Sequence, residues 1–218
     1  MSWLVKIGGS LFPKHAINLA NSLENTKSII ITGGGEFANL IREYDSKYKF
    51  SDDVSHKTAI ESMGILSELL NDKVESCKLA YDLNECDEIL KNGFTPILIV
   101  SEILSKNNPF ESSWNITSDS ISAYFANLLK AKLLIATNVE GIYNRNPNEK
   151  GSKLISEIDA KQLLTFKESS IDLELPSLLL KFGTDCYVVN GKHPERVISI
   201  IDENINNYNF KYTKIIGD

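Results

Sequence analysis

Cysteine is scarce in this chain, and its spacing limits what cysteine can do. The 218 residues include three cysteines, Cys77, Cys86 and Cys186, none of which belongs to a CxxC pair. An odd number of widely separated cysteines argues against both a disulfide framework and a zinc site. We therefore expect reduced, partly buried thiols.

Long apolar runs and an excess of positive charge are also missing. No apolar stretch approaches the roughly 20 residues that cross a bilayer, and residues 1–6 do not begin a secretory leader. The net charge of -6 gives no basic surface for nucleic acid. We expect a cytoplasmic protein that binds neither membranes nor nucleic acids, folded as a single domain over residues 1–218.

The familiar phosphate-binding motifs are absent as well. Neither GxxxxGK[ST] nor GxGxxG occurs, and the protein-kinase signatures HRD and DFG are missing. These absences exclude the P-loop, the usual dinucleotide fingerprint and the protein-kinase catalytic loop.

What the chain does contain is a pair of glycine turns, each directly after a predicted strand. Residues 3–7 lead into Gly8-Gly9-Ser10, and residues 28–32 lead into Gly33-Gly34-Gly35. A helix is expected after each turn. Backbone N–H groups and helix N-termini gathered at one edge of a sheet are suited to binding phosphates.

The stretch from Trp114 to Pro147 combines a capped helix, a buried strand and a polar loop. Thr117 or Ser118 is a suitable N-cap, and Asp119 falls in the first helical turn. The strand at 131–137 is apolar enough to be covered on both faces, as in a parallel sheet. Ligands bind where such strands end, although an ordinary helix, strand and turn is the alternative.

The rest of the sequence alternates between strand and helix patterns. Strands are predicted at 77–81, 96–100, 186–189 and 212–216, the last closing the sheet, and helices at 13–23, 36–48, 52–71, 82–91, 159–164, 178–182 and from Pro194. This alternation predicts an α/β fold, a three-layer αβα sandwich with a mainly parallel central sheet.

Lys6 lies two residues before the first glycine turn, on the strand that enters it. A lysine there can reach over the turn and neutralise a phosphoryl group in transfer, because that chemistry depends on positioning and on stabilising negative charge. The alternative is a surface lysine on an edge strand.

Four motifs, in this order, resemble the amino-acid kinase family: Lys6-Ile7-Gly8-Gly9-Ser10, Gly33-Gly34-Gly35, Thr117-Ser118-Asp119 and Thr137-Asn138-Val139-Glu140-Gly141-Ile142-Tyr143. Members of that family are ATP-dependent kinases of carboxylates, carbamate or phosphomonoesters. The resemblance implies an αβα sandwich that forms homo-oligomers, with an acceptor lobe in the N-terminal half and a nucleotide lobe in the C-terminal half. It also implies ATP and Mg²⁺ as cofactors.

A closer likeness concerns one branch of the family. Residues 33–42, 55–57, 113–120 and 187–197 resemble the kinases of methanofuran synthesis, which convert a small furan-bearing phosphomonoester into a diphosphate. The alternatives are a kinase of isopentenyl phosphate or of a nucleoside monophosphate, and a nucleotide-binding sensor or storage protein without turnover.

The resemblance implies a role for each matching residue. Lys6 would contact the transferred phosphoryl group, and Asp119 would orient Lys6 or hold the metal through water. The residues implied for the nucleotide are Gly8, Gly9, Ser10, Thr137, Asn138, Val139, Gly141, Tyr143 and Pro147, and those for the phosphorylated substrate are Gly33, Gly34, Gly35, Arg42 and His56. Mg²⁺ would be held by phosphate oxygens and water, so no protein metal ligands are expected.

One position departs from the family pattern, and three others have two interpretations each. Asn138 stands where the family commonly has aspartate, and Lys181 is either the family's second basic residue or a charge at a helix C-terminus. His56 is either a substrate contact or a helix-surface residue. Trp114 either stacks on a ring or, as we favour, plugs the core.

Overall fold

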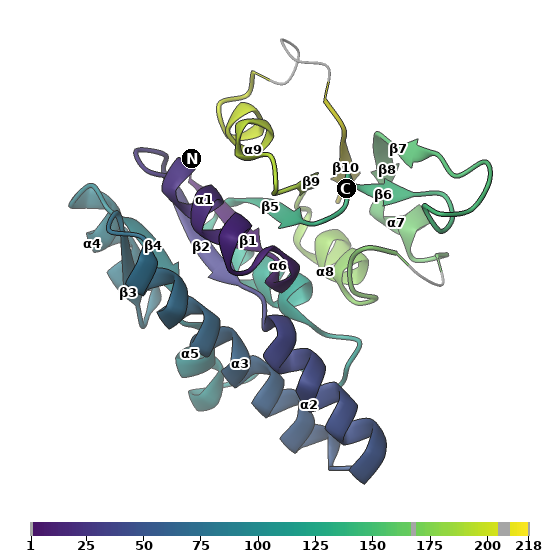
Figure 1. Ribbon diagram of the computed structural model, residues 1–218, viewed down its shortest axis with the longest axis horizontal. Helices are drawn as coiled ribbons and strands as arrows, with labels where there is room; N and C mark the ends of the chain where they lie inside the picture. The colour runs from purple at the N-terminus through teal and green to yellow at the C-terminus, as the bar shows by residue number, and fades with distance from the viewer. Residues whose placement is uncertain (1, 167–168, 205–209, 218) are drawn as a thin grey trace.

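A computed structural model describes residues 2–166, 169–204 and 210–217, and a mainly parallel sheet forms its centre (Figure 1). Within these residues the sheet has eight strands in the order β3-β4-β2-β1-β5-β9-β10-β8. The strands are β1 (Trp3–Ile7), β2 (Ser28–Thr32), β3 (Cys77–Ala80), β4 (Thr95–Leu98), β5 (Lys132–Thr137), β8 (Glu157–Asp159), β9 (Cys186–Asn190) and β10 (Tyr212–Ile216). Only β10 and β9 pair antiparallel in this sheet, which confirms the predicted sheet type. A separate antiparallel pair is formed by β6 (Ile142–Tyr143) and β7 (Leu154–Ile155).

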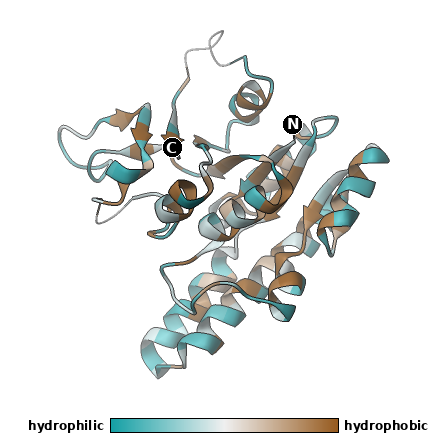
Figure 2. Ribbon diagram, turned by 180° about the vertical axis from the view of Figure 1, so that it is seen from behind, coloured by the Kyte–Doolittle hydropathy of each residue, from teal (hydrophilic) through white to brown (hydrophobic). Residues whose placement is uncertain are grey.

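Helices cover both faces of the sheet, which confirms the predicted three-layer sandwich. They are η1 (Gly9–Leu11), α1 (Lys14–Ser22), α2 (Gly35–Tyr48), α3 (Asp52–Lys73), α4 (Leu83–Lys91), α5 (Val100–Lys106), α6 (Ser118–Leu129), α7 (Ala160–Leu163), α8 (Leu175–Phe182) and α9 (Pro194–Ile201). One core cluster contains side chains of α6 and α8, and the other contains side chains of α1 and α9. Apolar residues are concentrated along the central strands between these layers (Figure 2). No helix within the described ranges is both long and apolar enough to cross a membrane.

The alternation of side chains along β1 decides where Lys6 points. Val5 and Ile7 belong to the cluster with α1 and α9, whereas Leu4 belongs to the cluster with α6 and α8. Because successive side chains of a strand point to opposite faces, Lys6 lies on the same face as Leu4. Lys6 therefore faces α6.

The ends of four neighbouring strands meet at one edge of the sheet. Ile7 of β1 is in register with Thr32 of β2 and with Ala136 of β5, and Thr137 of β5 is in register with Asn190 of β9. Both glycine turns and the loop after β5 therefore begin at this edge, where a doubly wound sheet binds its ligands.

Several elements differ from the predicted pattern, and β6, β7 and β8 were not predicted. The strand expected at 96–100 ends at Leu98, and α5 begins at Val100. Helix α8 begins at Leu175, three residues early, with Pro176 in its first turn, where proline is tolerated because its missing N–H would have no helical partner. The predicted last strand, β10, is not the edge of the sheet, because β8 pairs beyond it.

Candidate active site

A buried ion pair joins β1 to the start of α6. Lys6 Nζ lies 2.6 Å from Asp119 Oδ1, and the two residues are only 7% and 5% exposed. A buried charge is tolerated only when a partner compensates it, so neither residue can be removed without leaving the other uncompensated. The sheet supplies the cation and the first turn of α6 supplies the anion.

The start of α6 is capped by a residue from a distant segment, Asp172. Its Oδ2 accepts hydrogen bonds from Thr117 N and Thr117 Oγ1, each at 2.8 Å, and from Ser120 N at 3.0 Å. Its Oδ1 accepts from Ser120 Oγ and, at 2.9 Å, from Leu175 N in the first turn of α8. One carboxylate therefore satisfies N–H groups at the starts of two helices.

Asp172 also contacts the ion pair directly. Its backbone N–H donates to Asp119 Oδ2 at 3.3 Å. Burial, and after it the nearby charge of Asp119, raise the pKa of Asp172 above its ordinary value. The sequence reasoning missed this residue, because an aspartate just before a proline-containing helix indicates only a cap for that helix.

The two glycine turns touch each other beside the ion pair. A Cβ built on Gly9 would lie 2.2 Å from both the N and the Cα of Gly35, and one built on Gly33 would lie 2.9 Å from the N of Gly9, so neither turn has room for a side chain at these positions. Gly35 also has a φ of +57°, a conformation that favours glycine.

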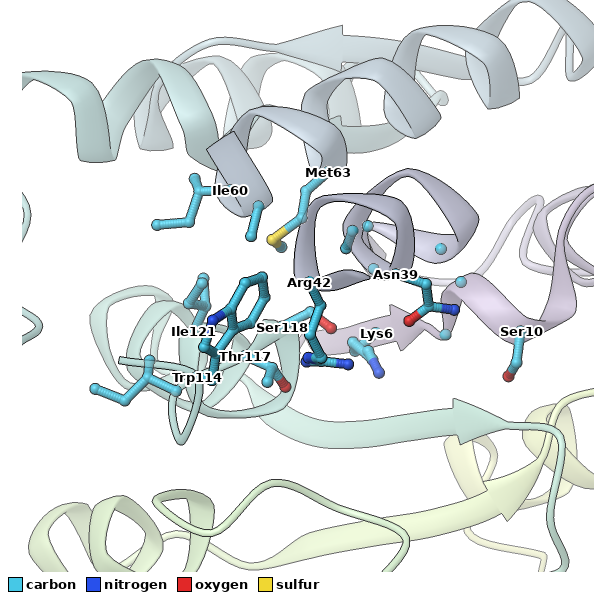
Figure 3. Close-up of a pocket in the computed structure, with 18 of the residues that line it drawn as sticks. Lys6, Ser10, Asn39, Arg42, Ile60, Met63, Trp114, Thr117, Ser118 and Ile121 are labelled. Carbon is cyan, nitrogen blue, oxygen red and sulfur yellow. The ribbon is translucent and has the colours of Figure 1, made fainter. Parts of the chain in front are cut away.

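A cavity of about 370 Å³ lies between Lys6, the glycine turns and α3 (Figure 3). Its lining includes Lys6, Gly8, Gly9, Ser10, Gly33, Gly34, Gly35, Asn39, Arg42, His56, Ile60, Met63, Trp114, Thr117, Ser118, Ile121, Thr137 and Ser170. The structure thus places Lys6, both predicted glycine turns, Arg42 and His56 around one space.

Trp114 and Arg42 form the outer part of this cavity. The guanidinium carbon of Arg42 lies 4.6 Å from the centroid of the Trp114 ring, and Arg42 extends between Trp114 and Lys6 (Figure 3). Trp114 Nε1 donates to Asp45 Oδ2 at 2.8 Å, which lowers the pKa of Asp45. The prediction that Trp114 plugs the core is wrong, because this side chain is only half-buried and lines the cavity.

His56 lies deeper, and it is 4% exposed. Its Nδ1 is 3.2 Å from the carbonyl oxygen of Ser113, and its Nε2 has no hydrogen-bond partner among the described residues. The alternative of a helix-surface histidine is therefore wrong. The contact with Ser113 also holds the segment before Trp114 against α3.

A second cavity, of about 280 Å³, lies beside the first. Its lining residues are Val139, Gly141, Tyr143, Arg145, Asn146, Pro147, Ser169 and Ser170. Ser170 lines both cavities, whereas Asn138 lines neither. The predicted nucleotide residues are thus divided between two adjoining spaces, and Asn138 lies outside both.

Glu140 fixes the loop that contributes to the second cavity. It accepts hydrogen bonds from Asn190 Nδ2 at 2.8 Å and from Arg196 at 2.6 Å. Burial alone would raise the pKa of Glu140, but the hydrogen bonds from Asn190 and Arg196 and the charge of Arg196 together lower it.

Lys181 does not take part in either cavity. It is exposed on α8, and its Nζ lies 5.8 Å from the centroid of the Phe182 ring. Its position in the last turn of α8 fits the alternative of a charge that complements the helix dipole.

Comparison with known proteins decides the family. The model of the amino acid kinase family matches residues 1–190. The chain belongs to the amino acid kinase family. Within that family it is 40% identical to [5-(aminomethyl)furan-3-yl]methyl phosphate kinase of Methanocaldococcus jannaschii, covering 98% of this chain and 97% of the relative. It is 30% identical to a uridylate kinase of Methanococcus maripaludis, covering 78% of each chain.

Solved structures of family members share the fold. The uridylate kinase of Archaeoglobus fulgidus matches with a TM-score of 0.75 and 19% identity, covering 99% of this chain and 100% of the other. The isopentenyl phosphate kinase of T. acidophilum, solved as a product complex, matches with a TM-score of 0.65 and 18% identity, again covering 99% and 100%. All four of these family members are named as kinases with phosphate-bearing acceptors.

Proposed function

We propose that this protein is an ATP-dependent kinase that converts a small phosphomonoester into a diphosphate, with [5-(aminomethyl)furan-3-yl]methyl phosphate as its substrate. The observation that supports the reaction is the buried pair of Lys6 and Asp119 beside two touching glycine turns. The identity of the acceptor is supported by the relative that shares 40% of its residues over nearly the whole chain.

The reaction requires little chemistry from side chains. An oxygen of the acceptor phosphate attacks the γ-phosphorus of ATP, the bond to the bridging β-γ oxygen breaks, and ADP leaves. The acceptor phosphate is already ionised, so no strong general base is needed. Lys6 neutralises the charge on the phosphoryl group, and Asp119 holds Lys6 in place.

The residues around the pair suit ATP and Mg²⁺. Glycine turns without room for a Cβ let the backbone approach phosphates closely. No cluster of three or more metal-binding side chains occurs in the part of the chain that the structure describes. On this proposal Mg²⁺ is held chiefly by phosphate oxygens and water, and it would supply further charge neutralisation when bound.

We place the nucleoside of ATP in the second cavity and the acceptor in the first. Arg42, His56 and Trp114, which we call the acceptor side, lie together with the apolar side chains of Ile60 and Met63. Arginine binds phosphate in bidentate geometry, and the apolar and aromatic surfaces suit a small flat ring. The polar side chains in this cavity make it less suitable for the apolar prenyl chain of isopentenyl phosphate.

A turnover experiment tests this assignment. The purified protein is mixed with ATP, MgCl₂ and either the furan phosphate, isopentenyl phosphate or UMP, and phosphorus NMR follows new phosphoanhydride signals. We expect the diphosphate from the furan phosphate. A signal from only one of the other acceptors would reassign the substrate, and ATP binding without any new anhydride would identify a sensor.

We also infer that copies of the chain associate through the exposed surface of α2. Helix α2 contributes no buried side chain, yet it exposes Phe37, Leu40, Tyr44 and Tyr48 at helical spacing. An exposed apolar surface of this kind marks an interaction site. Light scattering should detect an oligomer that Tyr44→Glu weakens, and a monomeric wild-type protein would contradict the inference.

A further inference from the structure

The hydrogen bonds of Asp172 do more than cap a helix. Its carboxylate holds the residues on either side of Asp119, because it accepts from Thr117 and from Ser120. Its backbone N–H at the same time donates to Asp119 itself. Asp172 thus holds the residues at positions 117 and 120, between which Asp119 lies, and it also contacts the side chain of Asp119 itself.

These contacts assign both oxygens of Asp119. Oδ1 lies against Lys6 Nζ, and Oδ2 accepts from the N–H of Asp172. The second contact fixes the rotation of the carboxylate about its last bond, and this rotation aims Oδ1 at Lys6. Helix α6 provides no substitute, since its N-cap residue Thr117 makes no side-chain cap of its own and instead donates to Asp172.

The segment that contains Asp172 also borders the space assigned to the nucleotide. Ser169 and Ser170 line the second cavity, and Ser170 lines the first as well. The five hydrogen bonds accepted by the Asp172 carboxylate keep this segment against α6 and α8. Because this segment borders both cavities, it belongs to the proposed active site and not only to the core.

We propose that Asp172 is a positioning residue for phosphoryl transfer, which holds Asp119 in the orientation that places Lys6 for the reaction. This inference rests on the proposed kinase function. Asp172 touches neither Lys6 nor, on this proposal, the substrates, and it acts through Asp119. Reacting groups displaced by about 1 Å lose on the order of 100-fold in rate, so an effect on turnover is expected without an effect on binding.

The variant Asp172→Asn tests the proposal, because it keeps the size of the side chain but presents an NH₂ group to donors. We expect kcat to fall by at least about tenfold while KM for ATP and for the acceptor changes less than about twofold. Asp82→Asn is the matched control. Asp82 is also the N-cap of a helix, α4, accepting from Asn84 N and Glu85 N, and it lines neither cavity. This control should lower the melting temperature and leave kcat unchanged.

A double variant separates positioning from general destabilisation. If Asp172 acts through Asp119, Asp119→Asn with Asp172→Asn should lose no more kcat than Asp119→Asn alone. Losses that multiply would overturn the proposal. An unchanged kcat in Asp172→Asn, accompanied only by a lower melting temperature, would overturn it too.

A structural measurement does not depend on turnover. In crystals of Asp172→Asn, Asp119 should have turned away from the 2.6 Å contact with Lys6, whereas wild-type crystals should keep this contact. An unchanged contact in the variant would overturn the positioning role. If wild-type protein shows no turnover with any acceptor, the kinase function fails, and the crystals still decide whether Asp172 orients Asp119.

Discussion

The proposed transfer centre, which comprises Lys6, Asp119 and the two glycine turns, differs from the proposed acceptor side in how it is supported. Lys6 and Asp119 come from a central strand and from a helix that packs on it, and both are buried. Arg42, in contrast, belongs to α2, a helix with no buried residue, and Trp114 belongs to an irregular segment. On the proposed function, the core therefore holds the chemistry, whereas two of the three acceptor-side residues, Arg42 and Trp114, belong to the periphery and the third, His56, is buried on α3. Changes in the two regions should separate into effects on kcat and effects on KM.

The largest effect is expected for Lys6→Ala. Removing the cation should lower kcat by about 1,000-fold or more, or roughly 4 kcal/mol of transition-state stabilisation, because no other lysine lines either cavity within the described residues. Steady-state kinetics measure the loss, and circular dichroism checks that the fold persists. Lys132→Ala, a lysine at the opposite end of β5, is the control. Near-normal turnover in Lys6→Ala would reject the proposed centre.

A smaller effect, of a different kind, is expected for Arg42→Ala. Loss of the phosphate contact and of the stacking on Trp114 should raise the acceptor KM by about 10- to 100-fold and leave KM for ATP unchanged. Arg42→Lys should restore only part of the affinity, because lysine lacks the bidentate geometry. Lys47→Ala, at an exposed position on the same helix, should have no effect. A fall in kcat alone would show that the two regions are not separable.

In the second cavity we expect the opposite result, an effect on KM for ATP and not on KM for the acceptor. Tyr143→Ala should raise KM for ATP by about tenfold without changing KM for the acceptor, because an aromatic ring at a nucleotide contributes through stacking. Tyr81→Ala, an exposed tyrosine outside both cavities, is the control. Competition between ATP and a fluorescent ATP analogue measures the affinity directly. A rise in KM for the acceptor instead of KM for ATP would mean that the assignments of the two cavities must be exchanged.

The same contrast explains what could be predicted from the sequence. Strands β1 and β2 are mostly apolar runs that glycines follow directly, so their ends and the position of Lys6 follow from local pattern. Asp172 could not be found in this way, because it lies 52 residues from Ser120 in a segment without regular structure. The environment of Trp114 was also wrongly predicted. It depends on Asp45, 69 residues away, and spacing along one chain does not show such a contact.

The smallest predicted effect concerns stability rather than turnover, at Glu140 beside the second cavity. The pKa of Glu140 is lowered in the folded protein by Asn190 and Arg196, against the opposing effect of burial. A carboxylate with a depressed folded-state pKa stabilises the fold above its unfolded value, about 4.3, and loses that contribution as the pH falls through the folded value. Glu140→Gln should therefore be less stable than wild type at pH 7 by about 1 kcal/mol or less, since the Glu140 side chain is 25% exposed and solvent screens the pair. Urea unfolding at several pH values should show this difference shrinking towards pH 3, with Glu102→Gln on α5 as the control. A difference that stays constant with pH would mean that lost packing, and not the charge of Glu140, connects this loop to α9.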